Sequence, residues 1–91
     1  MNTMVFEFND GRVVRLPSVG RPHDGIGTAR ELLEAMTNLR RVAWYGPSDD
    51  PQPERGVALP MFEAFMVSDR SMAWRVPSMA APAFYTISRG A

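Results

Sequence analysis

The chain contains neither cysteine nor lysine, and these two absences exclude several kinds of chemistry. Without cysteine there is no disulfide, no thiolate nucleophile, no zinc knuckle and no iron–sulfur cluster. Without lysine, neither a Schiff base nor the lysine of a P-loop is available. Because the chain has no disulfides and no recognisable secretory signal, we expect a cytoplasmic protein.

Histidine and long apolar runs are also scarce. The single histidine, His23, adjoins Asp24, but neighbouring residues rarely face each other well and no nucleophile is marked nearby. The uncharged stretch 76–88 is too short for the ~20 apolar residues of a membrane helix, and Pro77 and Pro82 interrupt it. We therefore expect no enzymatic activity, no metal, no cofactor and no membrane partner.

The remaining composition is that of one globular domain. The chain has 91 residues, of which 45% are hydrophobic and 22% charged, as in ordinary folded proteins. This length predicts a single domain spanning residues 1–91. Ten arginines balance ten acidic residues, and the formal net charge of zero gives little general attraction to nucleic acid or anionic membranes.

The N-terminal residues predict a β-hairpin. In the segment 4–8, Met4, Phe6 and Phe8 alternate with other residues and would share one face of a strand. Asp10-Gly11 suits a tight turn because glycine tolerates positive φ. The segment 12–16 would return as the second strand.

The middle of the chain predicts one amphipathic helix over residues 28–40. Leucine and methionine residues recur there at helical spacing. Thr28 and Glu31 resemble a capping box at its start. Arg40 and Arg41 stand at its end, where cations suit the carbonyl-rich terminus.

Strands follow this helix in the predicted order. Residues 41–45 form an apolar run typical of an interior strand. Residues 57–67 fit either a helix or a strand, and a hairpin 61–67/72–76 is slightly favoured. Residues 83–88 predict a last strand. The resulting fold class is α+β, with a mostly antiparallel sheet of four to five strands and the helix packed on one face.

One loop is a candidate anion site. The glycine-rich segment 18–27 precedes the predicted helix, whose first amides and positive dipole end could hold phosphate or carboxylate. Arg21, His23 and Arg30 would add positive charge. The simpler interpretation is a glycine-rich turn that leads into a capped helix.

The C-terminal half is rich in methionine and aromatic residues, which are enriched in protein interfaces. The simpler interpretation is that they fill the core. The alternative is that a subset is exposed for a partner, and the candidate partner-binding residues are Trp74, Met79, Phe84 and Tyr85.

These observations favour a small non-enzymatic protein-interaction module: an assembly subunit, adaptor or inhibitor of a larger complex, or a self-associating chain. Small domains of this kind are common among phage and mobile-element accessory proteins, which is an analogy of size and class only. The alternative is nucleic-acid or phosphate binding through the segment 12–41, which holds six arginines against three acidic residues.

Overall fold

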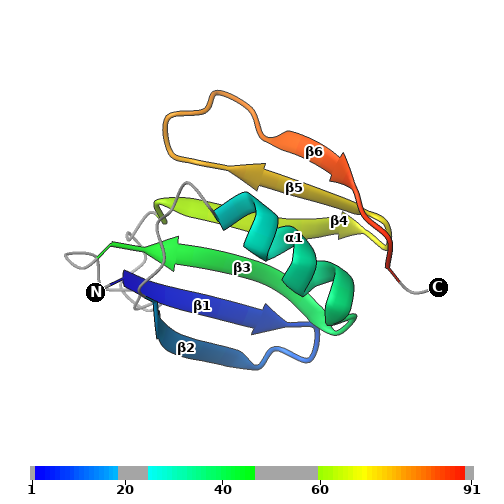
Figure 1. Ribbon diagram of the computed structural model, residues 1–91, viewed down its shortest axis with the longest axis horizontal. Coiled ribbons are helices and arrows are strands. Elements are labelled where there is room, and N and C mark those ends of the chain that lie inside the picture. Colours follow the sequence, from blue (N-terminus) through cyan, green and yellow to red (C-terminus); the bar gives the residue numbers. More distant parts are fainter. Residues whose placement is uncertain (1, 19–24, 47–59, 90–91) are drawn as a thin grey trace.

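The computed structural model describes residues 2–18, 25–46 and 60–89. These residues form one sheet of six strands in the order β2-β1-β3-β4-β5-β6, in which all neighbouring pairs are antiparallel (Figure 1). The elements in chain order are β1 Asn2–Phe8, β2 Val13–Ser18, α1 Gly25–Ala35, β3 Leu39–Tyr45, β4 Phe62–Ser68, β5 Ser71–Arg75 and β6 Ala83–Thr86. Six strands exceed the four to five predicted, because the ambiguous segment 57–67 contributes β4 and the short β6 joins the same sheet.

The predicted N-terminal hairpin is confirmed. Phe6 pairs with Val14 and Met4 with Leu16, so the alternating apolar residues of both strands share one face. The turn relies on Gly11, whose φ is +89°. Asp10 stabilises the turn by accepting a hydrogen bond from the Arg12 amide at 2.9 Å.

The single described helix lies across one face of the sheet, against β3 and β4 (Figure 1). Ala29 and Leu33, one turn apart on α1, are both fully buried between the helix and the sheet. The face of the sheet that α1 covers is called the helix face below. Val42, Trp44, Phe62 and Met72 are among the other buried residues of the main core there.

The predicted helix range 28–40 is wrong at both ends. Helix α1 begins at Gly25, so Thr28 lies inside it and does not cap it. The helix ends at Ala35 because Leu39 pairs with Phe8 on β1. Long-range strand pairing thus overrides the weak helical preference of residues 36–40.

The predicted role of Arg40 and Arg41 at the helix end is also wrong, because both lie in β3. Another cation, Arg89, lies beyond the end of the helix and binds carbonyls there. The guanidinium of Arg89 donates hydrogen bonds to the carbonyls of Met36 at 3.1 Å and Leu39 at 2.9 Å, and also to that of Thr37. The C-terminal segment therefore holds the connection between α1 and β3, where the Met36 carbonyl also accepts from the Leu39 amide at 3.0 Å.

The hairpin favoured for the second half of the chain is confirmed as β4 and β5. The interior position of the apolar run 41–45 is confirmed too, since β3 lies between β1 and β4. Among the residues that the structure describes, no helix combines the length and apolar character that crossing a bilayer requires.

Two glycine substitutions test the backbone geometry. Gly11→Ala places a Cβ at a positive φ and is expected to lower the free energy of unfolding by about 1–2 kcal/mol. Gly27→Ala puts a Cβ into open space on α1 and is expected to raise it by about 0.5–1 kcal/mol. Urea denaturation of both variants measures the difference. Equal effects of the two substitutions would contradict the assigned turn and helix.

Candidate functional site

The face of the sheet opposite α1, called the second face below, carries an unusual mixture of charged and apolar side chains. Antiparallel register brings paired residues to the same face. One row across the strands from β2 to β6 consists of Val13, Glu7, Arg41, Phe65, Ala73 and Phe84. The adjacent row, from β2 to β5, consists of Arg15, Val5, Ala43, Glu63 and Arg75.

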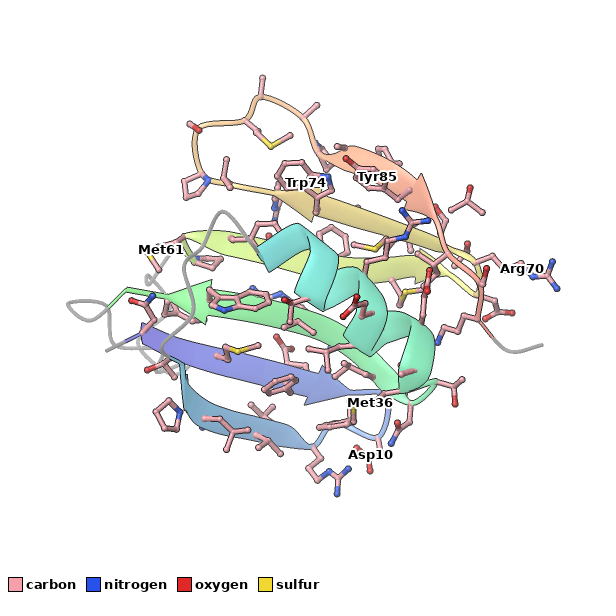
Figure 2. All side chains as sticks on the ribbon, viewed as in Figure 1. Asp10, Met36, Met61, Arg70, Trp74 and Tyr85 are labelled. Atoms are coloured by element: carbon pink, nitrogen blue, oxygen red, sulfur yellow. The ribbon has the colours of Figure 1, made fainter. Side chains whose placement is uncertain are left out.

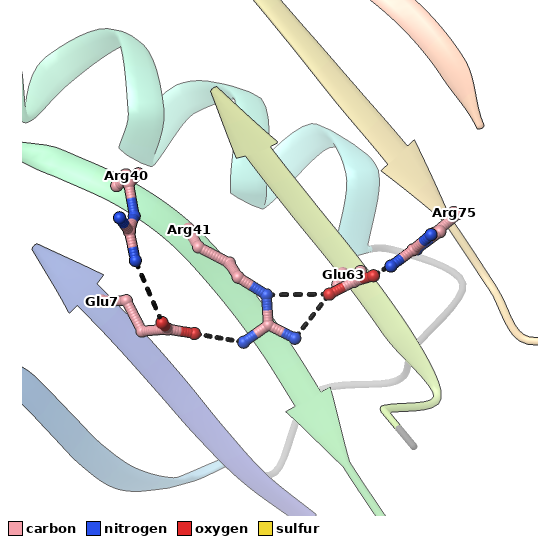
Figure 3. Close-up of polar contacts among 5 residues, drawn as sticks. All are labelled: Glu7, Arg40, Arg41, Glu63 and Arg75. Carbon is pink, nitrogen blue, oxygen red and sulfur yellow. Dashed lines mark hydrogen bonds and ion pairs between the residues drawn. The ribbon is translucent and has the colours of Figure 1, made fainter. Parts of the chain in front are cut away.

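Glu63 is the centre of an ion-pair network on this face (Figure 3). It is only 6% exposed, and it is the one buried charged residue among those described. The Nε of Arg41 donates to its Oε2 at 2.8 Å, and Nη2 of Arg41 donates to the same oxygen. The Nε of Arg75 donates to Oε1. Both carboxylate oxygens of Glu63 are therefore occupied.

Arg41 links Glu63 to a second carboxylate. Its Nη1 donates to Oε2 of Glu7 on β1, while Nη2 of Arg40 lies 3.5 Å from the other oxygen of Glu7. Alternating charges thus run across four strands, from Glu7 through Arg41 and Glu63 to Arg75 (Figure 3). Cross-strand pairs of opposite charge stabilise the register that produces them.

The network favours the charged forms of Glu63 and Arg41. Burial opposes the charge of Glu63, but hydrogen bonds from Arg75 and Arg41 outweigh it and hold the pKa of Glu63 below its ordinary value. Burial likewise opposes the charge of Arg41. Hydrogen bonds with Glu63, Tyr45 and Glu7 outweigh this effect and hold the pKa of Arg41 above its ordinary value.

Two guanidinium groups of the network reach solvent. The side chain of Arg75 is 54% exposed and that of Arg40 is 57% exposed, whereas Arg41 is 21% exposed. Arg75 also lies over the ring of Phe65, with its Cζ 5.7 Å from the ring centroid. This contact and the Nε bond to Glu63 hold the planar group of Arg75 in place.

Two shallow hollows share Arg41, Glu63 and Arg75. One, of about 430 Å³, also contacts Tyr45, Pro60 and Met79. The other, of about 270 Å³, adds Arg40, Phe65 and Met66. Arg75, the most exposed of the three shared residues, therefore borders both hollows.

An apolar patch adjoins the ion pairs. We define it as Phe65, Ala73 and Phe84, which are cross-strand neighbours on β4, β5 and β6. Ala73 is fully buried, Phe65 is half-buried and Phe84 is 61% exposed. An exposed aromatic ring in this position extends the patch to the edge of the sheet.

The predicted partner-binding residues divide between the two faces. Trp74 and Tyr85 belong to the helix face, where their rings stack with centroids 6.4 Å apart beside α1 (Figure 2). Tyr85 is 37% exposed, and Nε1 of Trp74 is buried without a hydrogen-bond partner among the described residues. Phe84 lies on the second face, and Met79 lines the 430 Å³ hollow there.

Of the predicted anion-binding residues, Arg21 and His23 lie outside the described residues. Arg30 donates to the Thr86 carbonyl at 3.0 Å and lies 3.4 Å from Glu34, and its Cζ is 5.9 Å from the ring centroid of Tyr85. The described part of the chain therefore uses Arg30 to join α1 to β6.

Sequence reasoning missed the network itself, which consists of Glu7, Arg40, Arg41, Glu63 and Arg75. A signal was present, because Glu63 stands alone between apolar residues of a predicted strand. Its partner could not be assigned, however. A register shift occurs between Met66 and Ser68, and a shift of one residue moves every side chain to the other face.

Within residues 2–18, 25–46 and 60–89, no group of three histidine, cysteine or acidic side chains could hold a metal ion. The chain matches no family model, no curated protein and no solved structure in the comparisons made.

The pH dependence of stability tests the network. Glu63 has a lowered pKa in the folded state, so it adds stability above the unfolded glutamate pKa of about 4.3 and loses it as the pH falls through the folded value. Glu63→Gln is expected to lower the free energy of unfolding by roughly 2–3 kcal/mol at pH 7, because Arg41 loses one of its two carboxylate partners. The loss is limited because Arg75 can turn to solvent.

Urea denaturation between pH 7 and pH 3 measures this cost. The difference in free energy of unfolding between the wild type and Glu63→Gln should become smaller below about pH 4. Glu31→Gln, on the exposed side of α1, is the matched control and should change stability by less than about 0.5 kcal/mol. If this difference in free energy of unfolding were the same at every pH, the charge of Glu63 would not be its cause.

Proposed function

We propose that the protein is a small interaction module that binds another protein through the apolar patch and the adjoining edge of β6. The observation that carries the proposal is the exposure of Phe84, which is 61% on a strand that contains no charged residue. Aromatic rings that anchor interfaces lie in such positions, next to polar groups that set orientation.

The backbone of β6 supports this choice. The Ile87 amide donates to the Arg70 carbonyl at 2.9 Å, and this pair continues the β5–β6 register. Because hydrogen-bonded pairs alternate along an antiparallel ladder, the backbone groups of Phe84 and Thr86 point to the outer edge. Arg30 occupies only the Thr86 carbonyl there. Such an edge offers main-chain hydrogen bonds to a partner strand.

The opposite edge of the sheet is partly protected by Pro17 on β2. The Phe8 amide donates to the Arg12 carbonyl at 2.9 Å, so the same alternation points the backbone of Pro17 outward. Proline has no amide hydrogen to donate to an added strand. The same alternation points the backbone of Val13 and Arg15 outward as well, so the exposed ring of Phe84, and not the backbone alone, favours the β6 edge.

The arginines expected for a nucleic-acid interface divide between elements: Arg15 and Arg41 lie on the second face, whereas Arg30 lies on α1. Arg12 stacks on Phe8, with its Cζ 4.4 Å from the ring centroid, and Arg30 joins α1 to β6. Arg41 is paired with two carboxylates. Protein binding is the better supported of the two functions, because Arg12, Arg30 and Arg41 already have partners within the chain, whereas the Phe84 ring is exposed.

Substituting Phe84 tests the proposal. Phe84→Asp places a charge in the apolar patch, and Leu16→Asp is the matched control, since Leu16 is 50% exposed near the opposite edge. Both variants and the wild type are immobilised and exposed to an extract of the source cells. Proteins retained by the wild type and Leu16→Asp, but lost by Phe84→Asp, are identified and purified.

Binding of each purified partner is then measured by calorimetry. Phe84→Asp should weaken the affinity by at least about tenfold, and Leu16→Asp should leave it unchanged. Light scattering of the isolated chain shows whether the partner is a second copy. Equal affinity for both variants would rule out the patch as the contact surface.

A further inference from the structure

We propose that Arg75 and Arg40 form a binding site for a single carboxylate on the second face. The inference rests on the proposed function only in assigning this carboxylate to a protein partner. The site itself is argued from the geometry of the ion-pair network and is tested with small molecules, so the two proposals can fail separately.

Arg75 presents unused donors in a fixed orientation. A guanidinium carries five N–H groups in a plane, and Arg75 uses its Nε for Glu63. Its two terminal nitrogens make no hydrogen bond with the described residues, and its side chain is 54% exposed. The Nε bond and the Phe65 ring orient these nitrogens before any ligand arrives. A carboxylate accepts two parallel hydrogen bonds from such a group.

Glu63 does not compete with an incoming anion. Its two oxygens already accept hydrogen bonds from Arg41 and Arg75, and it is buried. Glu63 therefore fixes the orientation of the Arg75 guanidinium by accepting the hydrogen bond from its Nε. Because Glu63 is held by Arg41 as well, it stays in place when the outer nitrogens of Arg75 bind a ligand.

The charge of the cluster favours one monoanion. Three guanidinium groups face two carboxylates, so one positive charge stays uncompensated. Arg40, which is 57% exposed, lines the same 270 Å³ hollow as Arg75. A carboxylate balances the charge of this cluster, whereas a phosphate dianion would exceed it.

The apolar patch beside Arg75 favours a carboxylate that is attached to an aromatic or aliphatic group. Phe65 belongs both to the lining of this hollow and to the apolar patch that continues to Phe84. A partner segment whose aromatic or aliphatic group covers the patch would bring an adjacent carboxylate to Arg75. The carboxylate belongs either to an aspartate or glutamate side chain or to the C-terminus of the partner.

Titration of the ¹⁵N-labelled full chain with sodium benzoate tests the site, with the arginine Nε–H resonances as the readout. Benzamide is the neutral control, inorganic phosphate is a second arm, and total ionic strength is kept constant. We expect a saturable shift of the Arg75 resonance with a dissociation constant roughly in the millimolar range for benzoate. Benzamide should produce no shift.

Variants show whether Arg75 itself binds the probe. Arg75→Gln should abolish the saturable response, which is then followed on the backbone amide of Phe65. Arg75→Lys, which keeps the charge but lacks the planar fork, should weaken binding severalfold. Arg12→Gln is the control, because Arg12 stacks on Phe8 and lines neither of the two hollows. Amide spectra of every variant establish that it is folded.

Three outcomes would overturn the proposal: equal shifts with benzamide, an unchanged response in Arg75→Gln, or tighter binding of phosphate than of benzoate. Further arms distinguish the two sources of the carboxylate. N-acetylphenylalanine carries a terminal carboxylate beside a ring, whereas N-acetyl-aspartyl-phenylalaninamide carries a side-chain carboxylate, and the tighter ligand identifies the source. Benzoate binding together with unchanged partner affinity of Phe84→Asp would retain this site and reject the proposed function.

Discussion

A buried carboxylate in the middle of the sheet determines how the second face is organised. Glu63 is 6% exposed, and a charge in that position is tolerated only when hydrogen-bonded partners surround it. Arg41 and Arg75 supply those partners from the two neighbouring strands. Arg41 in turn recruits Glu7, so one buried charge fixes side chains on four strands.

This interaction separates the second face into two parts with different properties. The centre, over β1, β3 and β4, is polar and internally paired. The margin over β4 to β6 is apolar, and its outermost ring, Phe84, is exposed. Arg75 stands between the two parts, bonded inward to Glu63 and stacked beside Phe65. A surface built in this way offers a partner both apolar area and an oriented cation.

Local sequence patterns predicted the two hairpins because their strands are close in the chain. The alternation of Met4, Phe6 and Phe8 and the Asp10-Gly11 turn were sufficient for the first. The helix end failed for the opposite reason. Leu39 continues the helical spacing, yet it pairs with Phe8, a contact that only the folded sheet creates. The same non-local register brings Glu7 to Arg41, so the ion-pair network could not be derived from the chain alone.

The candidate partner residues were predicted by type and not by position. Methionine and aromatic enrichment drew attention to the C-terminal half, but it could not tell which side of the sheet each residue occupies. Tyr85 and Phe84 are adjacent in sequence and lie on opposite faces, because side chains alternate along a strand.

Phe84 and Arg75 form an accessible surface beside a paired, enclosed centre. Paramagnetic relaxation by a soluble neutral gadolinium chelate, measured by NMR on the dilute chain, tests it directly. We expect strong relaxation of the Phe84 ring and the Arg75 Nε–H, and weak relaxation of Ala43 and Leu33, which are fully buried. Protection of Phe84 equal to that of Leu33 would show that the patch is already covered, and would contradict the account.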